Sequence, residues 1–354
     1  MHSSIQKSKR IGYIDALRGF TMILVVVMHV AKSLGVETGD SACFHYYLLQ
    51  FRMPLFFFIS GFVFYRAGFV WSSENIKRFL SKKVVVQVVS PFLFMMCYAA
   101  LIRYTVPEAV FNKDKLGYWF TFTLFEYFLL YIAIKKLMEA VGAKDRGVFV
   151  VMALVGLFLF FIPKQWMYED GMPLFVSNTV CLLGVSQLAF FVFFIIGAYV
   201  KRYFQKTEYI LDNSHLALFA VAVYLLVNVF IDLDSANVYL RKALLFVLAI
   251  CGVTMTFALF RKCRLFFSGN SPLSASLKFI GRRTLDIYLL HFFFLEIEVP
   301  ATFLRYVDGS APVREFFVSL LLALVVIAVS LAVSSLIRRS EVLARFLFGV
   351  RKSE

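Results

Sequence analysis

Repeated long apolar stretches constrain the fold of this chain more than any other feature. About ten segments of roughly 18–23 residues are apolar enough to cross the ~30 Å hydrocarbon core of a bilayer as helices. Mean hydropathy is +0.79 and 61% of the 354 residues are hydrophobic, which excludes an ordinary soluble domain. The predicted spans are residues 13–32, 46–65, 84–103, 119–136, 147–163, 177–200, 214–231, 241–260, 279–297 and 314–337. We therefore predict an all-α polytopic membrane protein, a bundle of about ten transmembrane helices in which residues 1–354 form a single membrane-embedded domain.

The distribution of basic residues supports this map and indicates an orientation. The net charge is +15, and most of the 37 Lys and Arg residues fall in the N-terminal segment, the loops after every second span and the C-terminal tail. Cytoplasmic loops of membrane proteins are enriched in Lys and Arg, so we expect both termini to be cytoplasmic, in a multi-pass protein of the cell inner (plasma) membrane. The positive charge then serves topology and contact with anionic membrane lipid, and we expect no nucleic-acid partner.

The first apolar stretch, residues 10–31, contains three charged or titratable side chains that hydrocarbon would penalise. Such groups usually face a protein interior or a water-filled cavity. Arg18 and His29 are eleven residues apart, so in a helix they point to the same side, about 16 Å apart along the axis. A guanidinium near the inner surface can bind phosphates, and an imidazole deeper in the bilayer can accept a proton from a hydroxyl. This geometry suits a long anionic cofactor whose reactive end lies far from its charged end. Asp15 is predicted to pair with Arg18 and orient it.

A second polar stripe lies in the ninth span. Thr284, Tyr288 and His291 follow one another at i, i+4 and i+7 on an otherwise apolar helix. His291 is predicted to approach the depth of His29, although a purely structural polar cluster explains the stripe equally well. Asp286 is expected to form a structural ion pair with Arg282 or Arg283.

Two further spans contain isolated polar residues. Arg52 is predicted at the outer end of the second span, near the mouth towards which His29 would open, and Ser60 permits close helix approach. Glu126, in the outer half of the fourth span, is an intramembrane acid. It is predicted either to orient a histidine or hold an acceptor, or to be a protonated carboxyl in helix packing.

Three sequence blocks resemble the membrane-bound acyltransferase type 3 family. They are DALRGFTMILVVVMH at 15–29, FRMPLFFFISGF at 51–62 and IGRRTLDIYLLHF at 280–292. The first contains an arginine followed, after ten residues, by a histidine, and the last contains the Tyr-Leu-x-His pattern typical of that family. The blocks follow the family's order and the resemblance covers nearly the whole chain. Arg52 departs from the neutral residue or histidine of many relatives, which bears on acceptor preference.

The resemblance implies transfer of an acyl group, usually acetyl from acetyl-CoA, to a hydroxyl of a surface polysaccharide or glycolipid. We predict catalytic roles for His29, His291 and Glu126, donor binding by Arg18, Asp15, Arg282 and Arg283, and acceptor binding by Arg52, Ser60 and Tyr288. A metal is not required. Within this enzyme class the alternatives are succinyl or another acyl group, an amine acceptor, and an acyl-histidine intermediate. In a different functional class, the alternative is an exporter or flippase of a glycan or lipid precursor. The sequence does not predict an oligomeric state.

Overall fold

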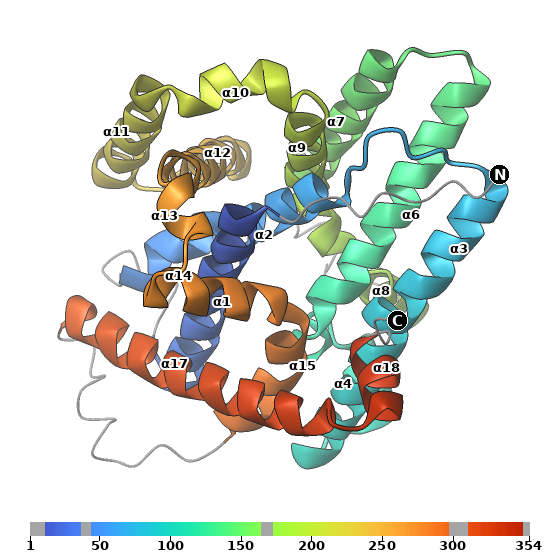
Figure 1. The fold of residues 1–354 in the computed structure, drawn as a ribbon, viewed down its shortest axis with the longest axis vertical. Helices are drawn as coiled ribbons and strands as arrows, with labels where there is room; N and C mark the ends of the chain where they lie inside the picture. Colours follow the sequence, from blue (N-terminus) through green and yellow to red (C-terminus); the bar gives the residue numbers. More distant parts are fainter. Residues whose placement is uncertain (1–10, 37–43, 164–172, 297–310, 350–354) are drawn as a thin grey trace.

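Helices make up nearly all of the chain that the computed structural model describes, residues 11–36, 44–163, 173–296 and 311–349, and no strand occurs in these ranges (Figure 1). Within these ranges six helical segments are long and apolar enough to cross a membrane, or seven if one bent pair counts as a span. The chain is therefore a polytopic α-helical membrane protein. The six segments are Gly12–Ser33 (α1), Phe44–Phe64 (α2), Ser73–Leu101 (α3, η1 and α4), Phe175–Arg202 (in α8, η4 and α9), Val238–Lys262 (α12) and Pro312–Ile337 (α17).

The other four predicted spans coincide with helices that are more polar, shorter, bent or broken. These are α6 (Trp119–Ala140), α7 (Asp145–Phe161), α11 (Ser214–Phe230), which forms a 67° bend with α10 (Phe204–Asp212), and α14 (Pro272–Arg282) with α15 (Thr284–Leu295). The prediction of one continuous helix over 279–297 is wrong, because α14 ends at Arg282 and α15 begins at Thr284. Short helices α5 (Val106–Phe111), η2 (Lys115–Gly117), α13 (Arg264–Ser268) and α18 (Glu341–Phe348) complete the described chain.

Two of the six segments contain non-α turns. A π-helical turn, η1 (Val85–Val89), joins α3 (Ser73–Val84) to α4 (Ser90–Leu101). Gly184 has a positive φ of 54° and separates α8 (Leu174–Leu182) from the 3₁₀ helix η4 (Val185–Phe190) and α9 (Phe191–Arg202). Glycine adopts this conformation without a Cβ penalty. Buried Gln187 of η4 donates to the carbonyl of Lys113, which ties the break to the segment before α6.

α1 is the central helix of the bundle. In its most apolar 18-residue window 78% of the residues are buried, against 22% for α17, which crosses the edge of the molecule (Figure 1). α1 also contributes to both hydrophobic clusters of the core. A helix buried on all sides can hold charged groups only where a cavity or a partner receives them.

A pair of glycines brings α1 and α14 into close contact. A Cβ on Gly19 would lie 2.0 Å from the carbonyl oxygen of Leu277, and a Cβ on Gly281 would lie 1.8 Å from that of Asp15. Small residues allow such backbone approach between membrane helices. The contact fixes the end of α14, and therefore the Arg282–Thr284 segment that follows it.

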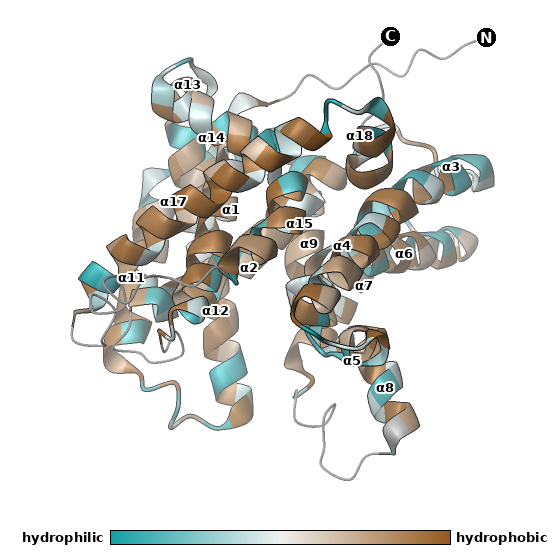
Figure 2. Ribbon diagram, turned by 90° about the horizontal axis from the view of Figure 1, so that it is seen from below, coloured by the Kyte–Doolittle hydropathy of each residue, from teal (hydrophilic) through white to brown (hydrophobic). Residues whose placement is uncertain are grey.

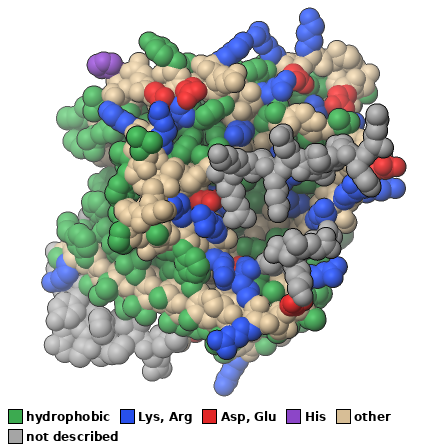
Figure 3. All heavy atoms as spheres, viewed as in Figure 1, with side chains coloured by type: hydrophobic (Ala, Val, Ile, Leu, Met, Phe, Trp, Pro, Cys, Tyr) green, Lys and Arg blue, Asp and Glu red, His purple; other side chains and the backbone are tan. Residues whose placement is uncertain are grey.

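Polar and apolar residues separate along the helices. Figure 2 shows apolar middle sections and hydrophilic residues at α3 and at the turn between α17 and α18. Lys and Arg side chains are numerous on the face of Figure 3. Ion pairs also join the ends of three helices: Lys135 of α6 and Arg202 of α9 both pair with Asp145, the first residue of α7.

Candidate active site

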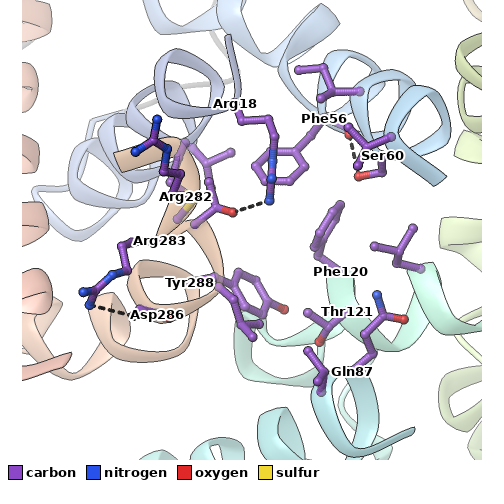
Figure 4. Close-up of a pocket in the computed structure, with 18 of the residues that line it drawn as sticks. Arg18, Phe56, Ser60, Gln87, Phe120, Thr121, Arg282, Arg283, Asp286 and Tyr288 are labelled. Atoms are coloured by element: carbon purple, nitrogen blue, oxygen red, sulfur yellow. Dashed lines mark hydrogen bonds and ion pairs between the residues drawn. The ribbon is translucent and has the colours of Figure 1, made fainter. Parts of the chain in front are cut away.

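A cavity of about 760 Å³ lies among the helices that carry most of the predicted site residues. α1, α2, η1, α6 and the α14–α15 break supply much of its wall, and Figure 4 shows Arg18, Ser60, Gln87 and Tyr288 around one space. The volume is within the range of small-molecule sites in proteins. The predicted site residues that line it are Arg18, His29, Arg52, Ser60, Arg282, Arg283 and Tyr288.

The charge of the cavity wall is strongly positive. Among the described residues the wall has one acidic side chain, that of Asp286. A wall of one sign in a low-dielectric surrounding concentrates ions of the opposite sign, so the cavity favours an anionic ligand. Its basic residues are Arg18, Arg52, Arg66, Lys83, Arg282, Arg283 and Arg338.

Arg18 is held in place by the helix break between α14 and α15. Its Nη2 donates to Thr284 Oγ1 at 2.9 Å (Figure 4), and Thr284 is the first residue of α15. Arg18 and His29 both line the cavity, as their spacing on one side of α1 predicts. About three helical turns separate them, or about 16 Å along the axis.

Asp15 is buried outside the cavity wall and forms an ion pair with a different arginine from the predicted one. Its Oδ2 lies 3.3 Å from Nε of Arg282, whose side chain does line the cavity. α14 brings Arg282 alongside Asp15 through the Gly281 contact, an approach between residues more than 260 positions apart. In the structure Asp15 therefore supports Arg282.

Asp286 links α15 to the end of α17 beside the cavity. The predicted ion pair with Arg283 is confirmed at 3.3 Å. Asp286 also accepts from Nε and Nη2 of Arg338, both at 2.7 Å, and from the hydroxyl of Ser334. Since Asp286 is 1% exposed, this network ties α15 to the end of α17.

The two predicted histidines meet. The ring centroids of His29 and His291 are 5.3 Å apart, and Phe292 packs edge-on against His29 at 5.0 Å. His29 lines the cavity, whereas His291 is fully buried behind it. Nδ1 of His291 lies 2.9 Å from the carbonyl oxygens of Ile287 and Tyr288. Carbonyls only accept, so Nδ1 of His291 carries hydrogen and donates to them.

Residues predicted to bind the acceptor line the cavity from two helices. Arg52 lies inside α2, eight residues after its first residue. Ser60 donates to the carbonyl of Phe56 at 2.8 Å, an intrahelical bond common for serine in membrane helices (Figure 4). The Tyr288 hydroxyl donates to the carbonyl oxygen of Gly117 over 3.4 Å, a long and weak hydrogen bond, and the side chain lines the cavity.

Glu126 is not brought to the histidines. It is absent from the described cavity wall, and its Oε2 faces the break at Gly184, 3.5 Å from the position of a Cβ there. Lys115, in the segment before α6, donates to the carbonyls of Val110 and Cys181 nearby. Burial lowers the pKa of the Lys115 ammonium, while the nearby Cys181 and Glu126 side chains act in the opposite direction and raise this pKa. Glu126 Oε2 is buried and has no hydrogen-bond partner among the described residues, so its position away from the cavity wall separates it from His29, while its role in packing stays a prediction.

Several wall residues were not predicted. Gln87 of η1 is 6% exposed, its Oε1 has no hydrogen-bond partner among the described residues, and it lines the cavity beside Lys83. Gln87 could have been predicted, because it is a lone side-chain amide in the apolar run 84–103. Arg66, Lys83 and Arg338 look in sequence like ordinary basic flanks of spans, so their position on the wall depends on the tertiary structure.

Comparison with known proteins adds one finding. A family model described as an acyltransferase domain matches residues 11–339. The curated proteins contain no match to the chain, and neither do the solved structures.

Proposed function

The chain belongs to the acyltransferase type 3 family, whose model covers residues 11–339, and we propose that it transfers an acetyl group from cytoplasmic acetyl-CoA to a hydroxyl of an extracytoplasmic polysaccharide or glycolipid. The observation that carries this proposal is one cavity lined by Arg18 at one level and His29 at another. Because the two lie about 16 Å apart along α1, a bound donor would keep its phosphates near Arg18 and present its thioester near His29.

Donor binding in this proposal depends on the basic wall. Arg18, Arg282 and Arg283 would bind the CoA phosphates, for which the planar guanidinium offers two parallel donors. Thr284 holds Arg18, Asp15 holds Arg282 and Asp286 holds Arg283. Fixed partners reduce the side-chain entropy that these long residues lose when a ligand binds.

Transfer would take place beside His29. As the acceptor hydroxyl attacks the thioester carbonyl, His29 accepts the hydroxyl proton. The tetrahedral intermediate then collapses, the C–S bond breaks, and the leaving CoA thiolate takes up that proton from His29. The products are an ester and CoA. The carbonyl oxygen becomes negative during this step and needs a donor, which the Tyr288 hydroxyl on the cavity wall can supply. His291 packs against His29 and would restrict its ring orientation.

The route requires an orientation in the membrane. We propose ten crossings with both termini cytoplasmic in the inner (plasma) membrane, since each predicted span overlaps a helix and Lys and Arg residues gather towards one set of helix ends. Arg18 would then face the cytoplasmic supply of donor, while His29, near the end of α1, would face the outside.

Purified protein in nanodiscs, given radiolabelled acetyl-CoA and surface polysaccharide, tests the proposal. His29→Ala should lower transfer by about 100-fold or more, the usual contribution of a general base. His215→Ala removes an exposed imidazole outside the cavity wall and should transfer as the wild type does. Equal transfer by His29→Ala and wild type would exclude the proposed role of His29.

Transport of a glycan or lipid precursor is the competing class, because intramembrane Arg and His also mark permeation paths. Movement of a glycolipid across liposomes by the purified protein without acyl-CoA would favour it. Mass spectrometry of surface polysaccharide from a deletion strain separates the acyl groups: a loss of about 42 Da per modified residue indicates acetyl and about 100 Da succinyl.

A further inference from the structure

Arg52 is the most unusual charged residue of the cavity. Its Nε and Nη1 atoms are buried, and neither has a hydrogen-bond partner among the described residues. It sits well inside α2 and lines the cavity. Buried donor atoms of a cation without a partner are costly, and proteins normally pair such groups. The pairing group for Arg52 is therefore expected in a ligand.

The other basic wall residues near α15 are already supported. Arg282 is paired with Asp15, while Arg283 and Arg338 are paired with Asp286. Arg52 is instead within electrostatic range of His29, at the end of the cavity where the proposed transfer takes place. It thus forms a second positive centre, separate from the one proposed to bind the CoA phosphates.

An acetyl donor offers nothing for this second centre. Between the phosphates and the thioester a CoA molecule has a neutral pantetheine arm, and the acetyl group is neutral as well. A negative charge at the level of His29 must come from the acceptor or from a longer acyl group. A carboxylate matches the two donors of a guanidinium in geometry and charge.

We infer that Arg52 binds a carboxylate carried by one of the two substrates beside His29: either an acidic sugar of the acceptor or the far end of a dicarboxylic acyl group such as succinyl. This inference rests on the proposed acyl transfer beside His29, not on the acyl group being acetyl, and names its substrate class. The carboxylate is not altered in the reaction; it aligns the substrate while the ester forms.

Four substrate combinations distinguish the two sources. CoA release is measured with acetyl-CoA or succinyl-CoA as donor and phenyl β-D-glucuronide or its methyl ester as acceptor, in nanodiscs containing wild type, Arg52→Gln or Arg52→Lys. Wild type should prefer one carboxylate-bearing substrate by about 10- to 100-fold in kcat/KM, as expected for a charge-assisted pair. Arg52→Gln should abolish that preference, and Arg52→Lys should restore it in part.

Arg241→Gln is the matched control. Arg241 pairs with exposed Asp234 outside the cavity wall, so its loss removes one positive charge without touching the site and should leave the preference unchanged. A preference for the glucuronide assigns the carboxylate to the acceptor, and a preference for succinyl-CoA assigns it to the donor. If Arg52→Gln lowers kcat/KM equally with all four substrate combinations, or lowers it with none, the inference is overturned.

A binding measurement keeps the inference separate from the proposed function. If wild type releases no CoA, the proposed function fails, yet thermal unfolding with the glucuronide, its methyl ester, succinyl-CoA or acetyl-CoA still reports on Arg52. Stronger stabilisation of wild type by the acid than by its neutral counterpart, absent in Arg52→Gln, supports the carboxylate site. Equal stabilisation of both variants by every probe excludes it.

Discussion

The contact between Gly281 and α1 should control donor binding although neither glycine of that contact lines the cavity. In Gly281→Ala the new methyl would lie 1.8 Å from the carbonyl oxygen of Asp15, whereas an ordinary contact begins near 3.4 Å. The two backbones must therefore separate by about 1.6 Å, the difference between these distances. Overpacking of this kind costs about 1–3 kcal/mol of stability.

The displacement should act on both arginine supports. Arg18 donates to Thr284 at 2.9 Å and Arg282 lies 3.3 Å from Asp15, and both contacts join α1 to the segment around Gly281. A shift of about 1.6 Å takes either contact beyond hydrogen-bond distance. A hydrogen bond made by a charged group contributes about 1.5–3 kcal/mol. If CoA binding loses this much free energy when the two arginines lose their partners, the Kd for CoA should rise by about 10- to 100-fold.

Calorimetric titration of CoA into protein in nanodiscs, together with thermal unfolding, measures both effects. Gly197→Ala is the matched control, because its Cβ would lie 1.9 Å from the carbonyl of Phe58, in the α2–α9 contact. It should destabilise the fold similarly and change the CoA affinity by less than about threefold. Gly147→Ala has no neighbour closer than 4.0 Å and should alter neither quantity. Wild-type CoA affinity in Gly281→Ala, or an equal loss in Gly197→Ala, would refute the reasoning.

Two further substitutions test the supports individually. Thr284→Val keeps the shape of the side chain but removes the hydroxyl that accepts from Arg18. The Kd for CoA should then rise by about tenfold without a large loss of stability. Unchanged affinity for CoA would show that Arg18 does not depend on Thr284. Asp286→Asn leaves Arg338 without its buried carboxylate and should lower the free energy of unfolding by on the order of 3 kcal/mol. Thermal unfolding measures this loss, and the control is Asp234→Asn, which breaks an exposed ion pair expected to contribute little. Equal stability of these two variants would argue against the buried network.

Much of the architecture and part of the site could be predicted from local patterns. Every predicted span overlaps a helix, because a run of apolar residues of membrane length has one stable form in hydrocarbon. Helical periodicity was sufficient to align Arg18 with His29, and both line the cavity. The same periodicity put Thr284, Tyr288 and His291 on one stripe, and the structure brings them to Arg18, the cavity wall and His29 respectively.

Contacts between distant segments could not be predicted in this way. Asp15 was expected to pair with Arg18 on its own helix, but α14 brings Arg282 to it, and the break at Arg283 interrupts a span that looked continuous. Glu126 was an intramembrane acid by sequence and proved to face Gly184.

The sequence by itself determined which residues share one side of a helix, because the 3.6-residue repeat is a local property of the backbone. Only the tertiary structure decided which sides face each other, since that depends on how closely two backbones can approach. Where Gly19 and Gly281 let α1 and α14 meet, separate arginines become one basic wall.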